Sequence, residues 1–392
     1  MLSNNAEEKL ADILVNRINK VNADILTEIG KSLKEISTLN VSKARQLQMI
    51  LRYGGDYNKI ARILAKISGR NVEDIYKIFK DVARTNKEFA KEFYDYRNVK
   101  YIPYEKDIAL QRQVLAMGNL TAELYKNITD TKGIGLIIDG EFKELKVAYS
   151  EIIDRAITSV VQGKEDFYKT MRRTIREVGG NGLVVYESGK TRRLDSAVRM
   201  NVLDGIRMVN NETNRIFGEE YGADGVEITV HEYPAPDHED VQGMQFSKKE
   251  FKKLQEGGVA EDVDGEEIDI HNGKGFRPIS EINCYHRPMN IVLGISKPQY
   301  NKKQLEEIKE RNNKGFRFEG KQYTMYEGTQ LQRRLETAIR RVREEKIIPK
   351  EIGDTKEINR LNSREKILRN KYDLLCTKSG LKRNLERMRV IR

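Results

Sequence analysis

Residues 10–36 read LADILVNRINKVNADILTEIGKSLKEI. Apolar side chains recur here at steps of three and four residues, which is the spacing of one face of a helix. That face comprises Leu10, Ile13, Leu14, Ile18, Val21, Ile25, Ile29, Leu33 and Ile36. The stretch therefore predicts one long amphipathic helix and a helical character for the start of the chain.

Further helical signals follow as far as residue 182. A helix is predicted from Tyr57 to Ile67, ending at Ser68-Gly69, and Asn71 is expected to cap the next one. Pro103 restricts the residue before it to extended geometry, so we expect an N-terminal helical module over residues 1–100. A second helical region, residues 101–182, is predicted to hold helices at 107–129, 142–161 and 165–178.

Strand signals begin at Leu183. Strands are predicted at 183–186, at 226–231, where apolar and polar residues alternate, and at 291–295. A helix is predicted at 194–221, and loops with short hairpins are expected between Pro234 and Gly275. We therefore expect a small α/β core over residues 183–300 with a loop-rich part that holds the histidines.

The last part of the chain, residues 301–392, reads as a basic helical segment. It is predicted to contain a helix at 302–311, a hairpin at 316–323 and an amphipathic helix at 327–346. The last 30 residues are predicted to be helical, with an interruption at Ser379-Gly380. The whole chain is thus expected to be α+β and mostly helical.

Composition excludes several classes of protein. The chain has 392 residues, of which 38% are hydrophobic and 33% charged, so it is not disordered by composition. It has no run of 18 apolar residues and no secretory signal at its start, so we expect no membrane span. Two cysteines cannot form a disulfide framework, which favours a reducing compartment.

Positive charge is concentrated at the C-terminal end. The net charge is +11, and residues 331–392 hold 19 Lys and Arg against 9 Asp and Glu, a net of +10. Such clustering suits a polyanion, although a solvated helical surface gives the same pattern. The residues predicted to contact nucleic acid are Arg333, Arg334, Arg340, Arg341, Arg343, Lys382, Arg383, Arg387 and Arg389.

Two motif-like stretches do not predict sites. Residues 188–191, Ser-Gly-Lys-Thr, resemble the end of a phosphate-binding loop, but Val184 stands where that motif requires Gly. A turn between strand and helix accounts for these residues. Residues 262–265, Asp-Val-Asp-Gly, place their Gly too early for a calcium loop and predict an acidic hairpin tip.

All four histidines lie between residues 231 and 286, at His231, His238, His271 and His286, and Cys284 lies in the same stretch. Imidazole and thiolate are preferred zinc ligands, so His231, His238, Cys284 and His286 are predicted to bind zinc. The same residues also suit hydrogen-bonded histidines at a loop-rich corner, and their spacing matches no common zinc-finger pattern. A hydrolytic site would need an open coordination position and a general base, for which Asp237 and Glu239 are candidates.

Several of these stretches together resemble a known family. They are residues 185–189 (Val-Tyr-Glu-Ser-Gly), residues 194–200, the helix up to Asn214-Arg215, residues 231–246 with His238-Glu-Asp-Val-Gln-Gly243, and Asn283-Cys-Tyr-His286. In order and spacing, over about residues 1–300, they resemble the phage minor capsid protein 2 group of tailed phages, akin to the Mu F-like head morphogenesis proteins. Three positions depart from the family pattern: Val241 replaces Trp, Tyr285 replaces Arg, and Ala235-Pro236 replaces Arg-Pro.

The resemblance implies a structural protein without an established enzymatic activity. It implies a place in the virion head, inside the capsid near the portal, after assembly in the host cytoplasm. The expected partners are the portal and major capsid proteins, in several copies per virion, and packaged double-stranded DNA for the basic segment. The alternative is a zinc-dependent hydrolase, a nuclease or peptidase that acts in head maturation or on the host.

Overall fold

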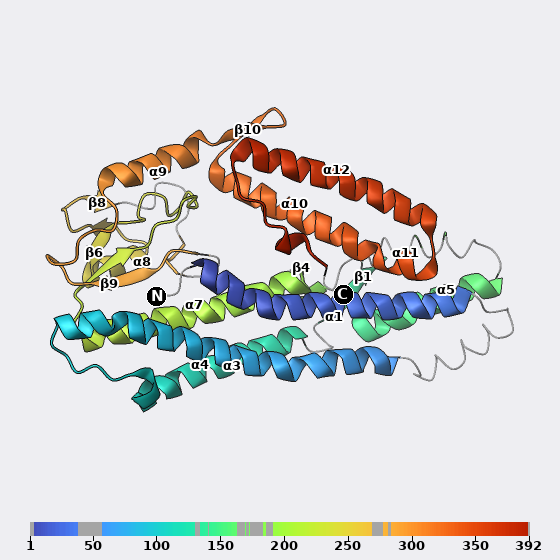
Figure 1. Cartoon of the computed structure of the whole chain (residues 1–392), viewed down its shortest axis with the longest axis horizontal. Helices are drawn as coiled ribbons and strands as arrows, with labels where there is room; N and C mark the ends of the chain where they lie inside the picture. The colour runs from blue at the N-terminus through green and yellow to red at the C-terminus, as the bar shows by residue number, and fades with distance from the viewer. Residues whose placement is uncertain are drawn as a thin grey trace.

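The computed structural model describes residues 4–37, 57–129, 134–139, 141–162, 169, 172, 183–185, 191–268, 277–280 and 284–390. Long helices lie side by side along the longest axis, and a small strand-containing region sits at one end of them (Figure 1). The predicted fold class, α+β and mostly helical, is confirmed. None of the described helices combines the length and the apolar character needed to cross a membrane.

A bundle that we call the helical body forms the largest part of the molecule. It consists of α1 (Asn4–Ser37), α3 (Tyr57–Tyr96), α4 (Ile108–Thr129), α5 (Leu145–Gln162) and α7 (Leu194–Glu220). The helix α7 packs against α1, α3 and α4, and the short η1 (Tyr104–Lys106) precedes α4. These helices share one continuous apolar core, to which each of them contributes buried side chains.

The helix predicted from residues 10–36 is confirmed as α1. Leu14, Ile29 and Leu33 are fully buried, as the periodicity predicts. Ile13 is 45% exposed, however, so its assignment to the buried face is wrong. It directly precedes Leu14, and adjacent residues of a helix point about 100° apart.

Two predicted boundaries in this part of the chain are wrong. Helix α3 runs unbroken through Ser68-Gly69 and Asn71, where a break and a cap were predicted. A glycine inside a helix costs only about 1 kcal/mol, which the packing of the apolar face between Ile75 and Tyr94 offsets. The helix predicted from Phe142 begins at Leu145, because residues 141–144 form a strand instead.

That strand belongs to a four-stranded sheet against the helical body. Its strands are β1 (Ile134–Ile138), β2 (Glu141–Glu144), β3 (Leu183–Val185) and β4 (Thr191–Arg193), in the order β2-β1-β3-β4. All pairings are antiparallel. The predicted strand at 183–186 is confirmed as β3. Apart from residues 169 and 172, the predicted helix at 165–178 lies outside the described residues, as does most of the turn at 188–191.

Residues 225–291, which we call the His/Cys region, form a smaller unit at the N-terminal end of α1. A three-stranded antiparallel sheet, ordered β6-β5-β9, contains β5 (Gly225–Ile228), β6 (Gln245–Ser247) and β9 (Pro288–Ile291). The helix α8 (Lys248–Gln255) and a hairpin of β7 (Ala260–Glu261) and β8 (Glu267–Ile268) complete it. The hairpin confirms the predicted acidic tip, where Asp262 accepts two backbone N–H bonds.

Two strand predictions in this region need correction. The strand predicted at 226–231 ends at Ile228 and is buried on both faces, because Glu227 is buried as well and accepts a hydrogen bond from Gln245 at 2.7 Å. The strand predicted at 291–295 is wrong, since β9 ends at Ile291. The backbone turns there, with Gly294 at φ +73° and Val292 accepting from the N–H of Ile295 at 3.2 Å.

The C-terminal part contains α9 (Lys302–Lys314), the hairpin of β10 (Phe316–Phe318) and β11 (Lys321–Tyr323), α10 (Met325–Glu345), α11 (Ile347–Ile352) and α12 (Thr355–Ser379). Helices α10 and α12 pack together as the outermost pair in Figure 1. The predicted interruption is confirmed, since Gly380 caps α12 at φ +73°. The residues after it were predicted to be helical, but they run back along α10 with only the short η2 (Glu386–Met388).

Candidate metal centre

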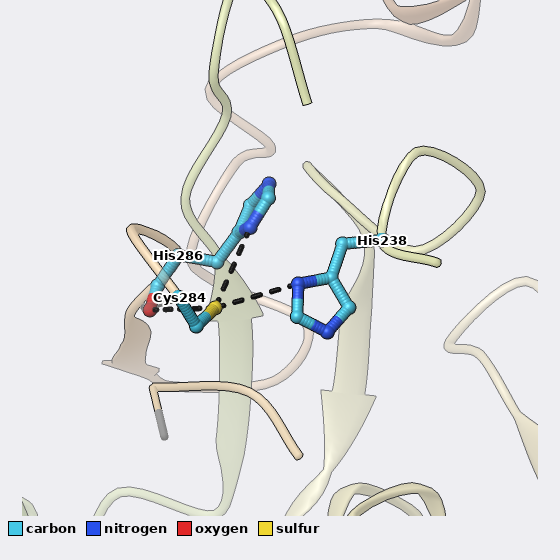
Figure 2. Close-up of side chains that lie close together, drawn as sticks. All are labelled: His238, Cys284 and His286. Atoms are coloured by element: carbon cyan, nitrogen blue, oxygen red, sulfur yellow. Dashed lines mark hydrogen bonds between the residues drawn. The ribbon is translucent and has the colours of Figure 1, made fainter. Parts of the chain in front are cut away.

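Strand pairing explains why residues that are far apart in sequence meet in the His/Cys region. Strands β5 and β9 are antiparallel neighbours, with Ile228 opposite Pro288. The chain just after β5 therefore lies beside the chain just before β9. This brings the segment from His231 next to His286. The turn that follows brings His238 to Cys284 and His286 (Figure 2).

His238, Cys284 and His286 converge on one point, and all three are buried. Their possible ligand atoms lie within 4.8 Å of one another. The thiol Sγ of Cys284 is 3.4 Å from Nδ1 of His238 and 3.7 Å from Nδ1 of His286. A tetrahedral zinc ion with ordinary Zn–S and Zn–N bonds places sulfur and nitrogen about 3.6 Å apart. Both separations match that value.

The outer nitrogen of each imidazole is held by an oxygen acceptor. Nε2 of His238 lies 2.6 Å from the carbonyl oxygen of Arg277, and Nε2 of His286 lies 3.3 Å from Oε1 of Gln242. A carbonyl oxygen can only accept, so each Nε2 carries the proton and each Nδ1 presents a lone pair toward Cys284. Histidines that bind metals are oriented in this way by a hydrogen bond from their other nitrogen.

The Gln242-Gly243 step fixes part of this arrangement. Oε1 of Gln242 also accepts the backbone N–H of His231 at 2.8 Å. Gly243 has φ +75° and donates its N–H to the carbonyl of Ile228 at 2.8 Å. A Cβ at this position would lie 2.5 Å from a methyl group of Leu305. The backbone therefore requires glycine here, and the turn carries Gln242 to the histidines.

Burial keeps the two imidazoles neutral. Burial lowers the pKa of His238, and burial together with His231 and His238 lowers the pKa of His286 to about 2. Burial also raises the pKa of the Cys284 thiol. Neutral imidazoles are ready to bind a metal, whereas the thiol must first release a proton.

His231, the fourth predicted ligand, lies beside this group without joining it. Its ring centroid is 4.5 Å from that of His286, and burial lowers its pKa as well. His231, His238, Cys284 and His286 all line a pocket of about 590 Å³. A cation at the cluster would therefore have three close ligands, and His231 lines the pocket beside them. His271 lies outside the described residues.

The two candidate general bases are already engaged. Asp237 receives two parallel hydrogen bonds from the guanidinium of Arg277, at 2.7 and 3.0 Å. Glu239 accepts from the amides of Asn312 and Asn313 on α9, at 3.0 and 3.1 Å. Through these hydrogen bonds, each carboxylate links two segments of the chain.

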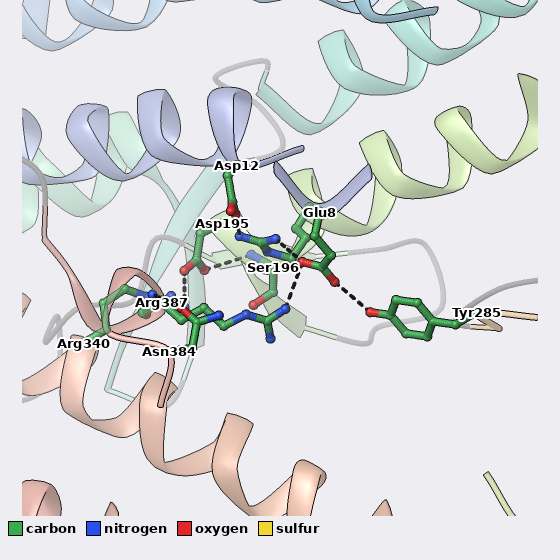
Figure 3. Close-up of polar contacts among 9 residues, drawn as sticks. Glu8, Asp12, Asp195, Ser196, Tyr285, Arg340, Asn384 and Arg387 are labelled. Carbon is green, nitrogen blue, oxygen red and sulfur yellow. Dashed lines mark hydrogen bonds and ion pairs between the residues drawn. The ribbon is translucent and has the colours of Figure 1, made fainter. Parts of the chain in front are cut away.

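A polar network connects the cluster to both ends of the chain (Figure 3). The hydroxyl of Tyr285, which follows Cys284, donates to Glu8 on α1 at 2.9 Å. Glu8 also pairs with Arg199 on α7 at 2.7 Å and with Arg387 near the C-terminus at 2.9 Å. Burial opposes the charge of Glu8, but these arginines outweigh it and hold the pKa of Glu8 below its ordinary value.

Three of the nine basic residues predicted to contact nucleic acid are bound to the interior of the protein. Arg340 is buried, is ion-paired with Asp195 and donates to the carbonyl of Arg387 at 2.7 Å. Arg343 is paired with Glu365 at 2.7 Å, and Arg387 with Glu8. In each case a carboxylate of the protein neutralises the arginine charge that would otherwise attract a phosphate.

The other six are closer to solvent. Arg333 lies over the ring of Tyr285, 5.7 Å from its centroid. Arg341, Arg383 and Arg389 pair with Glu345, Asp373 and Glu386 respectively. Arg334 and Lys382 are exposed and have no ion-pair partner within the described part of the chain. Contact of these nine residues with nucleic acid stays a prediction.

Sequence reasoning assigned no role to Gln242, to the carbonyl of Arg277 or to Tyr285. The available signal was the position of Gln242-Gly243 in the family-like stretch, between two histidine segments that had to meet. The carbonyl of Arg277 had no signal, because every residue carries one.

Comparison with known proteins identifies the family. The model of a family described as phage minor capsid protein 2 matches residues 4–373, nearly the whole chain. No curated protein and no solved structure matches the chain. The match extends beyond residue 300, where the resemblance read from the sequence ended.

Proposed function

The chain belongs to the phage minor capsid protein 2 family, and we propose that it is a structural component of the head interior, near the portal. Family membership supports a structural role in a phage capsid. The concentration of positive charge in residues 331–392 supports a position facing packaged DNA. The partners in this proposal are the portal and major capsid proteins, with several copies per virion, after assembly in the host cytoplasm.

Quantitative mass spectrometry of purified, DNase-treated particles tests this position. We expect a few to a few tens of copies per portal. Absence of the chain from mature particles would contradict the proposal and indicate an assembly factor or an enzyme.

We propose further that His238, Cys284 and His286 bind a zinc ion that stabilises the His/Cys region. The observation that carries this proposal is that each Nδ1 faces the thiol while each Nε2 is held by an oxygen acceptor. Two imidazoles and a thiolate are the donors that zinc prefers. The ion would join the segment after β5 to the segment before β9, across a part of the chain with few apolar residues.

Cys284→Ser tests the zinc site, and Cys376→Ser is its matched control. Both cysteines are buried, but Cys376 lies in the separate core between α10 and α12. We expect Cys284→Ser to lower both the zinc content and the melting temperature, and Cys376→Ser to leave the zinc content unchanged. Equal zinc content in wild type and Cys284→Ser would contradict the proposal.

The alternative, a zinc-dependent hydrolase, receives some support from the pocket beside the cluster. The engagement of Asp237 and Glu239 with Arg277, Asn312 and Asn313 speaks against it. A hydrolase predicts metal-dependent cleavage of a nucleic acid or peptide that is lost in Glu239→Gln. A structural ion predicts no such cleavage.

A further inference from the structure

We propose that the outer face of α12, together with Lys382 just beyond its C-terminal end, binds the phosphate backbone of double-stranded DNA. One face of this helix, with Leu361, Tyr372 and Leu375, packs toward α10 and is buried. The opposite face looks outward from the molecule (Figure 1). This face of α12 includes none of the arginines of α10 that the sequence predicted to contact nucleic acid.

Charge on this exposed surface has almost one sign. Between residues 355 and 390, two acidic side chains are half exposed or more, Asp373 and Glu386, and each pairs with an arginine. The exposed basic side chains there are Lys356, Arg360, Arg364, Lys366, Arg369, Lys378, Lys382, Arg383 and Arg389. A surface of this composition attracts a polyanion through its local field.

Ion pairing separates these cations into two groups. Arg360, Arg364, Arg383 and Arg389 each pair with a carboxylate of the chain. The remaining five have no ion-pair partner within the described ranges, so their charge is available to a ligand. They are Lys356, Lys366, Arg369, Lys378 and Lys382. Of these five, the sequence pattern predicted only Lys382.

The dimensions of this surface suit a duplex. Lys356 and Lys378 are 22 residues apart on one helix, which is about 33 Å along its axis. One turn of B-form DNA spans about 34 Å. Asn359 and Asn370 are exposed between these cations, and amide side chains commonly donate to phosphate oxygens.

The same surface lacks what single-stranded nucleic acid requires. Tyr372 is the sole aromatic residue after Tyr326, and it is buried between α10 and α12. Without an exposed aromatic ring, bases have no platform on which to stack. Contacts with phosphate alone give binding that does not depend on sequence, as packaged DNA requires.

The biological meaning of this surface rests on the proposed place in the head, but its chemistry can be tested separately. We suggest measuring fluorescence anisotropy with the full chain and two unrelated 30-base-pair duplexes, at several salt concentrations. The test variant neutralises the five free cations: K356Q, K366Q, R369Q, K378Q and K382Q. The control neutralises five exposed lysines on other elements: K77Q, K80Q, K100Q, K106Q and K297Q.

For wild type, we expect equal affinity for both duplexes and a steep fall with salt. Each phosphate contact contributes about 0.9 to the slope of log K against log salt, so the test variant should lose about 4–5 units of slope. The control should keep the wild-type slope, although both variants lose five charges. Equal losses in both variants would overturn the proposal, because net charge alone would then explain binding.

Other results are equally decisive. Unchanged binding in the test variant, or no duplex binding by wild type, would overturn the proposal and favour an acidic protein surface as the partner of α12. The proposed position in the head is tested independently of DNA binding, by mass spectrometry of the particles. Duplex binding by a chain absent from particles would leave this surface intact and refute only the location.

Discussion

The helical body and the His/Cys region are stabilised in different ways. The helical body shares one apolar core to which every one of its long helices contributes. The His/Cys region has a separate core with few members: Ile228, Val241, Phe246, Leu254, Ala260, Ile268 and Ile279. Its other ties are polar, such as Asp237 with Arg277 and Gln242 with His231. The contrast shows how a short-stranded, loop-rich unit holds its shape without much apolar surface.

The two regions also contact each other through charge. Arg287 of the His/Cys region pairs with Glu7 on α1 at 2.7 Å, and both side chains are buried. Tyr285 bonds to Glu8 one residue further along α1. These contacts anchor the His/Cys region to the start of α1. Substitutions on either side of this junction can therefore test how each region is stabilised.

The largest effect is expected from a cavity in the helical body. Phe79 on α3 is fully buried, and Phe79→Ala should lower the free energy of unfolding by about 3–5 kcal/mol. Chemical denaturation measures this loss. Phe89→Ala on the same helix is the control, because Phe89 is 49% exposed and should cost far less. Similar losses in both variants would show that apolar packing does not dominate this region.

Zinc removal should instead destabilise the His/Cys region. A ligand at about 1,000 times its Kd stabilises the state that binds it by about 4 kcal/mol, which a strong chelator would remove. Hydrogen exchange should then speed up in β5 and β9 while α1 remains protected. Cys284→Ser should respond little to the chelator. Loss of protection spread evenly over both regions would show that the two regions are not stabilised separately.

A smaller effect is expected where the C-terminal residues meet α1. Arg387 and Glu8 are each about one-fifth exposed, and Arg387→Gln should cost about 1.5–3 kcal/mol. The pKa of Glu8 is lowered in the folded protein. The contribution of the ion pair to the free energy of unfolding is therefore complete above the ordinary Glu pKa of 4.5, and it is lost as pH falls through the pKa of Glu8 in the folded protein. The difference between wild type and variant should therefore shrink in acid.

Urea denaturation at pH 7 and at pH 3.5 measures that difference. Arg389→Gln is the control, because Arg389 pairs with Glu386 on an exposed surface. A difference for Arg387→Gln that grows toward acid would contradict this account of Glu8.

The sequence predicted the structure of the helical body better than that of the His/Cys region. Long helices such as α1, α4 and α7 were predictable because their apolar faces repeat over many turns. The strand predicted at 291–295 was wrong because four apolar residues around a glycine are too few to separate a strand from a buried turn. Glu227, in the middle of β5, is buried against Gln245, a partner that alternation within one strand does not reveal.

The candidate metal centre was predictable in its residue types but not in its geometry. Clustering of the histidines with Cys284 indicated the ligands, and the meeting of His238 with His286 needed the pairing of β5 with β9. For the basic residues the sequence was less informative. Charge in residues 331–392 was visible, but whether an arginine faces solvent, as Arg334 does, or Asp195, as Arg340 does, depends on packing.

The smallest effect is expected at the start of α9, which borders the His/Cys region. Asn301 caps this helix by accepting from the N–H of Gln304, whose side chain in turn accepts from the N–H of Asn301, both at 2.9 Å. Asn301→Ala should cost about 1 kcal/mol in thermal or chemical unfolding. Asn359→Ala on the exposed face of α12 is the matched control and should be neutral or slightly stabilising, since alanine is the better helix former. At the far end of α9, Asn312 and Asn313 donate hydrogen bonds to Glu239 of the His/Cys region. A loss well above 2 kcal/mol in Asn301→Ala would therefore show that α9 also supports the His/Cys region. It would also show that the polar contacts there act cooperatively.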